Sequence, residues 1–260
     1  MKKIFNIIFI LSINNLIAQN LLIKYERTLY EEFENGVNKI CPTILYTNSE
    51  ESYFLEDRVI NGHSTEVSLE NYRLNDTLGI KIKGDSLGQL VYKNLNKIFF
   101  NQRRRVAGYK NETYGFISDT ILPKFEWSLK KEFDEILGYE VQKATTKYLD
   151  RFITAWFTYD ISISNGPWKF TNLPGLILKV EIKLTNESYL IYEATSIKTI
   201  KTIPYFDFSN TTKFSLEEIE DFYKKKYKNQ YNYLRTKTNG DIKIRKDDLD
   251  FKPIIYDSNQ

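Results

Sequence analysis

Apolar and charged residues alternate most clearly between Leu176 and Leu184. The apolar register continues without a break and consists of Leu176, Leu178, Val180, Ile182 and Leu184. Lys179, Glu181 and Lys183 lie between these positions. A period of two predicts a β-strand with one face in a core and the other in water.

The same kind of signal recurs in short segments along most of the chain. The other apolar or alternating segments are 21–26, 43–46, 52–55, 78–83, 90–93, 97–101, 125–129, 139–148 and 151–159. Turn-forming pairs such as Asn35-Gly36 and Asn61-Gly62 separate several of them. Many short strands with turns between them favour an antiparallel meander over a βαβ arrangement.

Residues 151–159 differ from the other segments because both of their registers are apolar. Phe152 and Trp156 lie in one register, and Ile153, Ala155, Phe157 and Tyr159 lie in the other. A strand of this kind is expected to be central in its sheet or to lie under another element.

One amphipathic helix is predicted over residues 215–227. Ser215 is a suitable N-cap, and Glu218, three residues later, completes a capping box. The apolar stripe at helical spacing consists of Leu216, Ile219, Phe222, Tyr223 and Tyr227. The helix is expected to pack on the sheet and cover one of its faces; a helix that binds a partner or a membrane is the alternative. The predicted fold is therefore mainly β (α+β): a single antiparallel, strongly curved or half-open barrel-like sheet with one C-terminal helix.

The segment before the clearest strand reads as an ordered loop, Pro167 to Gly175. Gly166-Pro167 and Pro174-Gly175 are turn dipeptides, in which proline presets φ and glycine accepts the positive φ of a type II turn. This loop carries two aromatic residues, and two interpretations stay open. Either they belong to the core and the loop is a structural turn, or the loop binds a ligand or partner. The candidate binding residues are Trp168, Phe170, Pro174 and Gly175, together with Trp156.

The first eighteen residues have the pattern of a secretory signal peptide. Lys2 and Lys3 precede an apolar stretch, and Ala18 offers a small residue before a cut. No cysteine follows the cut, which argues against an N-terminal lipid anchor. The predicted organisation is a signal peptide over 1–18, a single β-rich domain over 19–228 and a charged tail over 229–260. No later stretch is apolar enough to span a membrane as a helix.

Composition excludes several classes of function. The chain has 37 Lys and Arg against 34 Asp and Glu, so no concentrated basic character indicates nucleic-acid binding. Cys41 and His63 are the only residues of their types, which is too few for a zinc site. No metal, cofactor or catalytic residue is predicted. Catalysis is unsupported, although a carboxylate pair assembled from distant strands stays open.

Residues 126–178 carry a specific resemblance. The matching positions are Trp127-Ser128-Leu129, Ile136, Gly138-Tyr139, Lys143-Ala144, Arg151, Ala155-Trp156-Phe157, Gly166-Pro167-Trp168-Lys169-Phe170 and Leu173-Pro174-Gly175-Leu176-Ile177-Leu178. This stretch resembles the core of the GLPGLI family of exported proteins from Gram-negative bacteria. Asn172 stands where the first glycine of that motif is expected, and Ser162 stands where proline is expected. Since Asn tolerates positive φ better than most residues, we expect the turn to survive. The resemblance implies an exported, mostly antiparallel β protein and assigns no catalytic residues.

The sequence thus predicts an exported protein, periplasmic or secreted, that acts as a non-catalytic binding or carrier module for a hydrophobic ligand or peptide. The alternative is an interaction protein of outer-membrane or secretion machinery, in which an exposed strand edge adds to a partner sheet. A hydrolase is the third hypothesis. Three stretches, at 76–78, 85–87 and 119–121, resemble an Asp-(Ser/Thr)-aliphatic motif of O-glycosylated exported bacterial proteins, which leaves modification open. The oligomeric state, strand order and ligand are not predicted.

Overall fold

The computed structural model describes residues 19–31, 39–56, 67–71, 78–82, 89–109, 112–148, 151–184, 188–208 and 212–213, and single positions between 215 and 229. The predicted signal peptide, His63 and the predicted C-terminal tail, apart from position 229, lie outside these residues.

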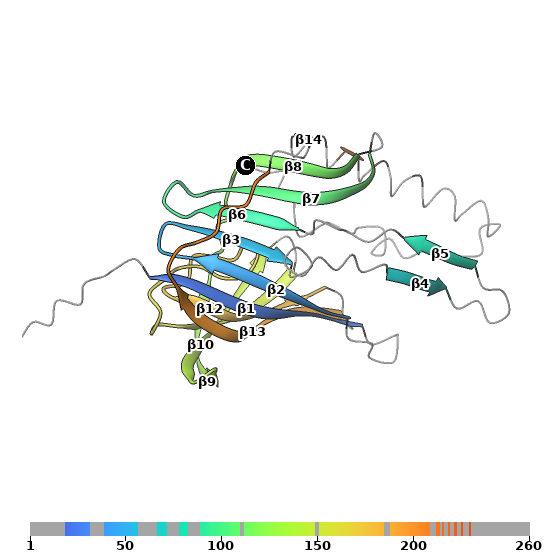
Figure 1. Ribbon diagram of the computed structural model, residues 1–260. Coiled ribbons are helices and arrows are strands. Elements are labelled where there is room, and N and C mark those ends of the chain that lie inside the picture. The colour runs from blue at the N-terminus through green and yellow to red at the C-terminus, as the bar shows by residue number, and fades with distance from the viewer. Residues whose placement is uncertain are drawn as a thin grey trace, which may run out of the picture.

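Strands account for most of the described chain. They are β1 (Asn20–Glu31), β2 (Lys39–Thr47), β3 (Glu51–Glu56), β4 (Val67–Asn71), β5 (Leu78–Ile82), β6 (Leu90–Asn94), β7 (Phe99–Tyr109), β8 (Glu112–Ile121), β9 (Ser128–Ile136), β10 (Tyr139–Tyr148), β11 (Arg151–Thr158), β12 (Leu176–Lys183), β13 (Ser188–Ile200) and β14 (Thr212–Lys213). Among the described strands, β4 and β5 pair only with each other and form a separate two-stranded sheet (Figure 1).

Within the described ranges, twelve strands form one open sheet. Their order is β14-β8-β7-β6-β3-β2-β1-β13-β12-β11-β10-β9, so β14 and β9 lie at the two edges. All neighbours are antiparallel except β14 and β8. The predicted mainly β, antiparallel architecture is confirmed. Two meanders make up the sheet, and the long-range pairing of β1 with β13 joins them.

The sheet turns its two halves toward each other around a shared core (Figure 1). Phe54 in β3 and Tyr192 in β13 belong to strands three places apart, yet their ring centroids are 5.9 Å apart. The Tyr25 hydroxyl of β1 donates to the backbone carbonyl of Ile177 in β12 at 2.7 Å. Contacts of this kind are made where the inner face of a sheet is concave.

The loop between β11 and β12 fills this concave side. Phe170 is fully buried, with its ring centroid 5.1 Å from that of Phe125, and Trp168 packs on Phe170 at 5.6 Å. The Trp127 indole N–H donates to the carbonyl of Thr171 at 2.8 Å. The loop is ordered, as predicted, and its aromatic residues belong to the core.

The predicted type II turn at Pro174-Gly175 is wrong. Positive φ is found instead at Trp168 (51°) and Asn172 (70°), and Gly175 is outside the left-handed region. Asn172 therefore takes the conformation for which a glycine was expected. Gly175 is required for a different reason: a Cβ there would lie 1.9 Å from the backbone oxygen of Thr158.

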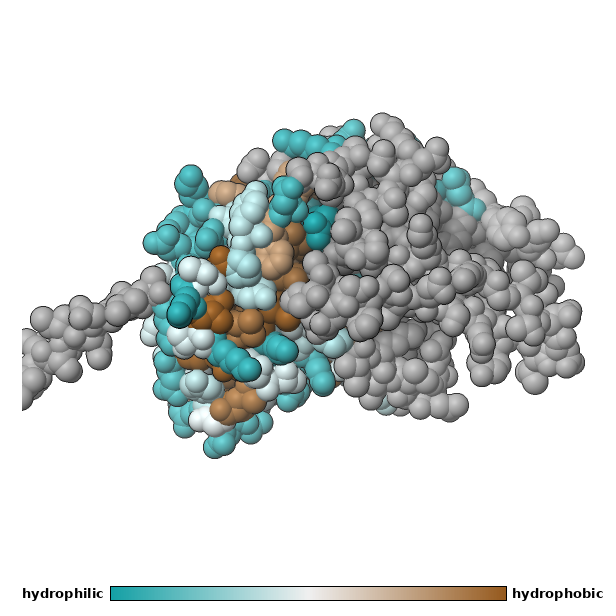
Figure 2. Space-filling model, viewed as in Figure 1, coloured by the Kyte–Doolittle hydropathy of each residue, from teal (hydrophilic) through white to brown (hydrophobic). Residues whose placement is uncertain are grey.

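A second apolar cluster lies on the opposite face of β2, β3 and β6. It contains Ile44, Tyr53, Leu55 and Leu90, and residues 201–208 cross over it. Phe206 of that segment packs on Tyr53, with ring centroids 5.3 Å apart. Figure 1 shows the segment passing in front of these strands, and Figure 2 shows apolar surface bordered by hydrophilic residues on the same side.

The expectation that both faces of 151–159 are covered is wrong in the described residues. Phe152 is 66% exposed, Tyr159 is exposed, and Trp156 is half-buried. The predicted strand at 125–129 also begins later, at Ser128, because Phe125 is part of the core before the strand starts.

The predicted capping box is present at the start of 215–227. The backbone N–H of Ser215 donates to Glu218 Oε2 at 2.9 Å, and the backbone N–H of Glu218 donates to Ser215 Oγ at 3.1 Å. Most of the residues that follow lie outside the described positions, so the helix and its packing on the sheet stay a prediction. Among the residues that can be described, no helix has the length and apolar character to cross a membrane.

Candidate ligand-binding groove

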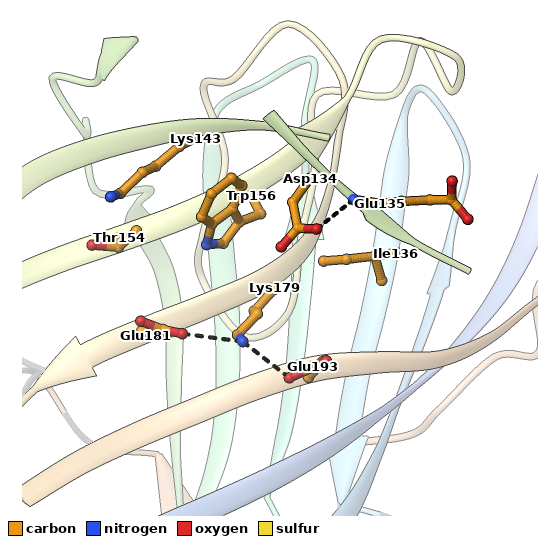
Figure 3. A pocket seen from close by; sticks show the side chains of 9 residues that line it. All are labelled: Asp134, Glu135, Ile136, Lys143, Thr154, Trp156, Lys179, Glu181 and Glu193. Atoms are coloured by element: carbon orange, nitrogen blue, oxygen red, sulfur yellow. Dashed lines mark hydrogen bonds and ion pairs between the residues drawn. The ribbon is translucent and has the colours of Figure 1, made fainter. Parts of the chain in front are cut away.

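The outer faces of β9 to β13 form a groove with a cavity of about 250 Å³. Its lining comes from five consecutive strands of the sheet and consists of Asp134, Glu135, Ile136, Lys143, Thr154, Trp156, Lys179, Glu181 and Glu193 (Figure 3). Seven of these nine residues carry a charge or a hydroxyl, so the groove is polar around one indole ring.

Strand alternation places Trp156 in the groove. Ile153, Ala155 and Phe157 of β11 point to the buried inner face. Thr154 and Trp156 therefore point outward, because successive side chains of a strand alternate between faces. The Trp156 ring is half-buried and forms the apolar part of the lining.

Lys143 of β10 lies beside this ring. Its Nζ is 5.7 Å from the centroid of Trp156 and 2.7 Å from Glu132 Oε2. The register of β10 and β11 places Lys143 directly opposite Trp156. The ammonium group thus has both a carboxylate and the face of an aromatic ring near it, an arrangement that stabilises a positive charge.

Lys179 of β12 joins two carboxylates on the other side of the ring. Its Nζ is 3.1 Å from Glu181 Oε1 and 3.3 Å from Glu193 Oε2 (Figure 3). Burial lowers the pKa of Lys179, but the hydrogen bond that Lys179 donates to Glu181 and the negative charge of Glu193 outweigh burial, so the net shift raises that pKa. Lys179 is therefore held as a cation that fixes two glutamates at the groove wall.

The β9–β10 hairpin closes the groove at one end. Leu137 and Gly138, at φ 54° and 81°, form its two-residue loop, and Ile136 pairs with Tyr139 on either side. Two central residues with positive φ define a type I′ turn, whose twist matches that of the strands. Figure 3 shows the Asp134 carboxylate directed into the groove and the Glu135 side chain directed away from Trp156.

Of the five predicted binding residues, only Trp156 lies in this groove. Trp168, Phe170 and Gly175 are buried in the loop that fills the inner side of the sheet, and Pro174 is exposed on that loop. The two buried rings present no free face to a ligand, which favours the structural interpretation of the loop. A binding role for these residues stays a prediction.

Lys93 makes a buried polar contact between the same loop and β6. Its Nζ donates to Asn165 Oδ1 and to the carbonyl of Gly166, the latter at 2.8 Å. Asn165 Nδ2 in turn donates to Thr47 Oγ1 at 2.8 Å. Burial holds the pKa of Lys93 well below its usual range. These contacts join the two meanders across the inner side.

The described residues do not bring together the side chains of a metal site or of an activated nucleophile. No cluster of three or more His, Cys, Asp or Glu with metal-binding geometry occurs among the residues placed. Cys41 is buried in β2, and its thiol lies 3.7 Å from the carbonyl of Pro42. What the groove residues can do is hold a polar ligand against an indole ring.

Sequence reasoning missed Asp134, Lys143, Lys179, Glu181 and Glu193 as site residues. The alternating charges at 179, 181 and 183 marked the outer face of a strand, but no sequence pattern indicated that β9 and β10 lie on the same side of the groove. Trp156 was the usable signal, since it occupies the register opposite to that of the core residues of β11.

Residues 95–224, half of the 260-residue chain, match the family described as "N-glycanase peptide, N-terminal domain". The chain belongs to this family. The match to the N-glycanase N-terminal domain does not test the GLPGLI resemblance, which stays a prediction.

Solved structures agree with membership in the N-glycanase N-terminal domain family. PNGF-II in the C2 space group matches with a TM-score of 0.55 and 25% identity, over 78% of this chain and 32% of that one. The P21 form gives the same score and identity over 79% and 33%. The chain therefore spans about a third of the length of PNGF-II. A LolA superfamily protein from Nitrosomonas europaea matches at a TM-score of 0.30 and 7% identity, values too low to indicate a shared fold. No curated protein matches the chain.

Proposed function

We propose that this chain is a non-catalytic binding module that recognises a glycan in the groove of β9 to β13. The observation that carries the proposal is the half-buried Trp156 ring, which lines the groove between ion-paired carboxylates. A sugar ring has an apolar face of C–H groups and an edge of hydroxyls. The indole offers a flat apolar surface for the first, and carboxylates accept hydrogen bonds from the second.

The charge pattern of the groove supports a neutral or weakly basic sugar. Lys143 and Lys179 are both held by glutamates, and Asp134 adds a further carboxylate directed into the groove. Hydroxyl groups can donate to these acids without bringing an opposing negative charge. A family named for an N-glycanase points to the same class of ligand.

A carrier for a hydrophobic ligand in a half-open barrel finds less support. The loop of 159–175 occupies the inner side, where its Phe170 packs against Phe125 and the Nζ of its Lys169 lies over the ring of Phe100. A groove lined largely by charged residues suits a lipid poorly, since those groups would lose water without gaining partners.

The test is glycan binding by the wild-type protein and by Trp156→Ala. We expect a glycan array to identify bound oligosaccharides, and calorimetry to show at least about tenfold weaker binding for the variant, as for a central aromatic hot spot. Tyr205→Ala is the matched control, because Tyr205 is an aromatic residue 79% exposed outside the groove. Absence of any bound glycan, or equal affinity of Trp156→Ala and wild type, would refute the proposal.

Export is part of the same proposal and rests on the sequence of residues 1–18. The basic start, the apolar stretch and Ala18 support cleavage by signal peptidase. N-terminal sequencing of the protein recovered from its native source is expected to begin at Gln19. A chain that begins at Met1 outside the cytoplasm would contradict this.

A further inference from the structure

β9 is an edge strand with unusual exposure. Among the described strands it pairs with β10 alone, so its other edge offers unpaired backbone N–H and C=O groups. Seven of its nine residues are exposed, including Leu129 at 48% and Phe133 at 57%. Natural proteins usually protect a long edge strand of this kind, because it is a template for pairing with another chain.

The register of β9 shows which of its residues share a face. Leu129 lies opposite the buried Ala144, and Phe133 lies opposite Gln142, whose neighbour on β11 is the buried Phe157. Directly opposed residues share a face of the sheet. Leu129 and Phe133 therefore lie on the inner face of the sheet, where both are exposed.

Alternation from Phe133 adds Lys131 and Glu135 to this inner row; the register with β10 shifts between Leu129 and Phe133, which both stay on the inner face. Glu135 borders the outer groove, but Figure 3 shows its side chain directed away from Trp156, as expected for an inner-row position. Leu137, 45% exposed, follows at the hairpin turn. The inner row of β9 thus consists of Leu129, Lys131, Phe133 and Glu135, and Leu137 follows it in the turn.

This row is complementary to the same row of a second copy of the chain when the two β9 strands run antiparallel. With Phe133 at the centre, Phe133 faces the Phe133 of the other copy, Lys131 faces its Glu135, and Leu129 lies level with Leu137 in its hairpin turn. Each of the two unlike pairs occurs twice by symmetry. Cross-strand aromatic, aliphatic and opposite-charge pairs are the contacts that stabilise an antiparallel pair.

We propose that β9 is a dimerisation strand, which pairs antiparallel with β9 of a second copy of this chain about a two-fold axis at Phe133. On the outer face, this register places Glu132 of one copy opposite Asp134 of the other. Lys143, 2.7 Å from Glu132, reduces the repulsion there. An isologous contact of this kind closes on itself and gives a dimer rather than a fibre.

The dimer would form a continuous sheet across both copies. Because β9 also lines the outer groove through Asp134, the two grooves would lie next to each other on the same face. A ligand with two recognition units could then bind both copies at once and gain in avidity. The dimer itself does not depend on the identity of the ligand.

Sedimentation velocity of the full chain tests the first part of the proposal. We expect the wild type to be a dimer in the micromolar range and Phe133→Lys to be monomeric, since the variant sets two like charges against each other at the axis. Phe152→Lys is the control, because Phe152 is also an exposed aromatic strand residue but lies on β11, away from the free edge. A monomeric wild type, or a dimer unchanged by Phe133→Lys, overturns the proposal.

Charge exchange tests the register. Lys131→Glu and Glu135→Lys should each weaken the dimer about tenfold, because each variant places like charges in both of the symmetric pairs. An equimolar mixture of the two variants should restore a heterodimer, and Lys131→Glu combined with Glu135→Lys in one chain should restore the homodimer. Restoration also shows that the single variants are folded. If the mixture stays monomeric, the proposed register is wrong.

Discussion

At Gly175 the chain passes so close to the end of β11 that no side chain fits. A Cβ would lie 1.9 Å from the carbonyl oxygen of Thr158 and 2.9 Å from its carbon. Both atoms belong to backbone, which cannot rotate away as a flexible side chain can. The close approach lets the backbone N–H of Leu176 reach the carbonyl of Ile161 at 3.0 Å, where β12 begins.

Gly175→Ala is therefore expected to lower the free energy of unfolding by about 3 kcal/mol, at the upper end of the range for overpacking. Chemical denaturation followed by tryptophan fluorescence measures it. Pro174→Ala is the control, because Pro174 is the exposed neighbour and should change stability little. An alanine variant as stable as the wild type would show that the loop can move away from β11.

Local backbone requirements could be predicted only in part from the residues. Asn172 was expected to accept the left-handed conformation in place of glycine, and its φ of 70° confirms this. Gly175 was also identified, but for positive φ, and the true reason is a neighbour seventeen residues earlier. A tertiary close approach leaves no signal in a local turn pattern.

At the scale of elements, alternation predicted strands well where one face is buried. The predicted strand at 139–148 matches β10. The predicted strand at 176–184 matches β12, which ends one residue earlier, at Lys183. β8 and β13 were not predicted. The faces of β9 could not be predicted, because its exposed residues are mixed apolar and charged and carry no inward pattern.

The start of the predicted helix can be tested through its cap. Ser215→Ala removes the acceptor that Glu218 N–H uses at 3.1 Å, and loss of such a cap costs about 1 kcal/mol of helix stability. We expect faster hydrogen exchange at the Glu218 amide. Ser215→Asp keeps an acceptor and should preserve protection. Equal exchange in Ser215→Ala and wild type would show that the capping box contributes nothing.

At the scale of the molecule, the pairing of β1 with β13 determines the architecture. It joins residues about 170 positions apart, such as Tyr25 and Ala194. Short strands and turns predict meanders, but they do not tell which two ends of separate meanders meet. The groove depends on the same arrangement, since its residues come from five strands between 134 and 193. Trp156 could be selected from the sequence as a candidate site residue. Its charged neighbours could be identified only once the order of the strands in the sheet was known.

Lys93 links the two meanders and gives the whole molecule a pH-dependent stability. Its folded pKa is lowered by burial, whereas an unfolded lysine titrates at about 10.4. Above that pH the side chain is neutral in both states and burial carries no charge penalty. As pH falls below it, the unfolded chain takes up a proton that the folded chain does not, so stability decreases down to the lowered folded pKa.

Between these two pKa values, the stability of the wild type should rise with pH by up to about 1.4 kcal/mol per unit relative to Lys93→Met, which has no proton to exchange. Denaturation at several pH values from neutral to 10 measures the difference in slope. Lys97→Met, at an exposed lysine in the turn after β6, should keep the wild-type slope. Parallel slopes for the wild type and Lys93→Met would mean that Lys93 stays charged in the folded protein. The hydrogen bonds from Lys93 to Asn165 and Gly166 would then be donated by a charged ammonium group, and they would offset the free-energy cost of burying that charge.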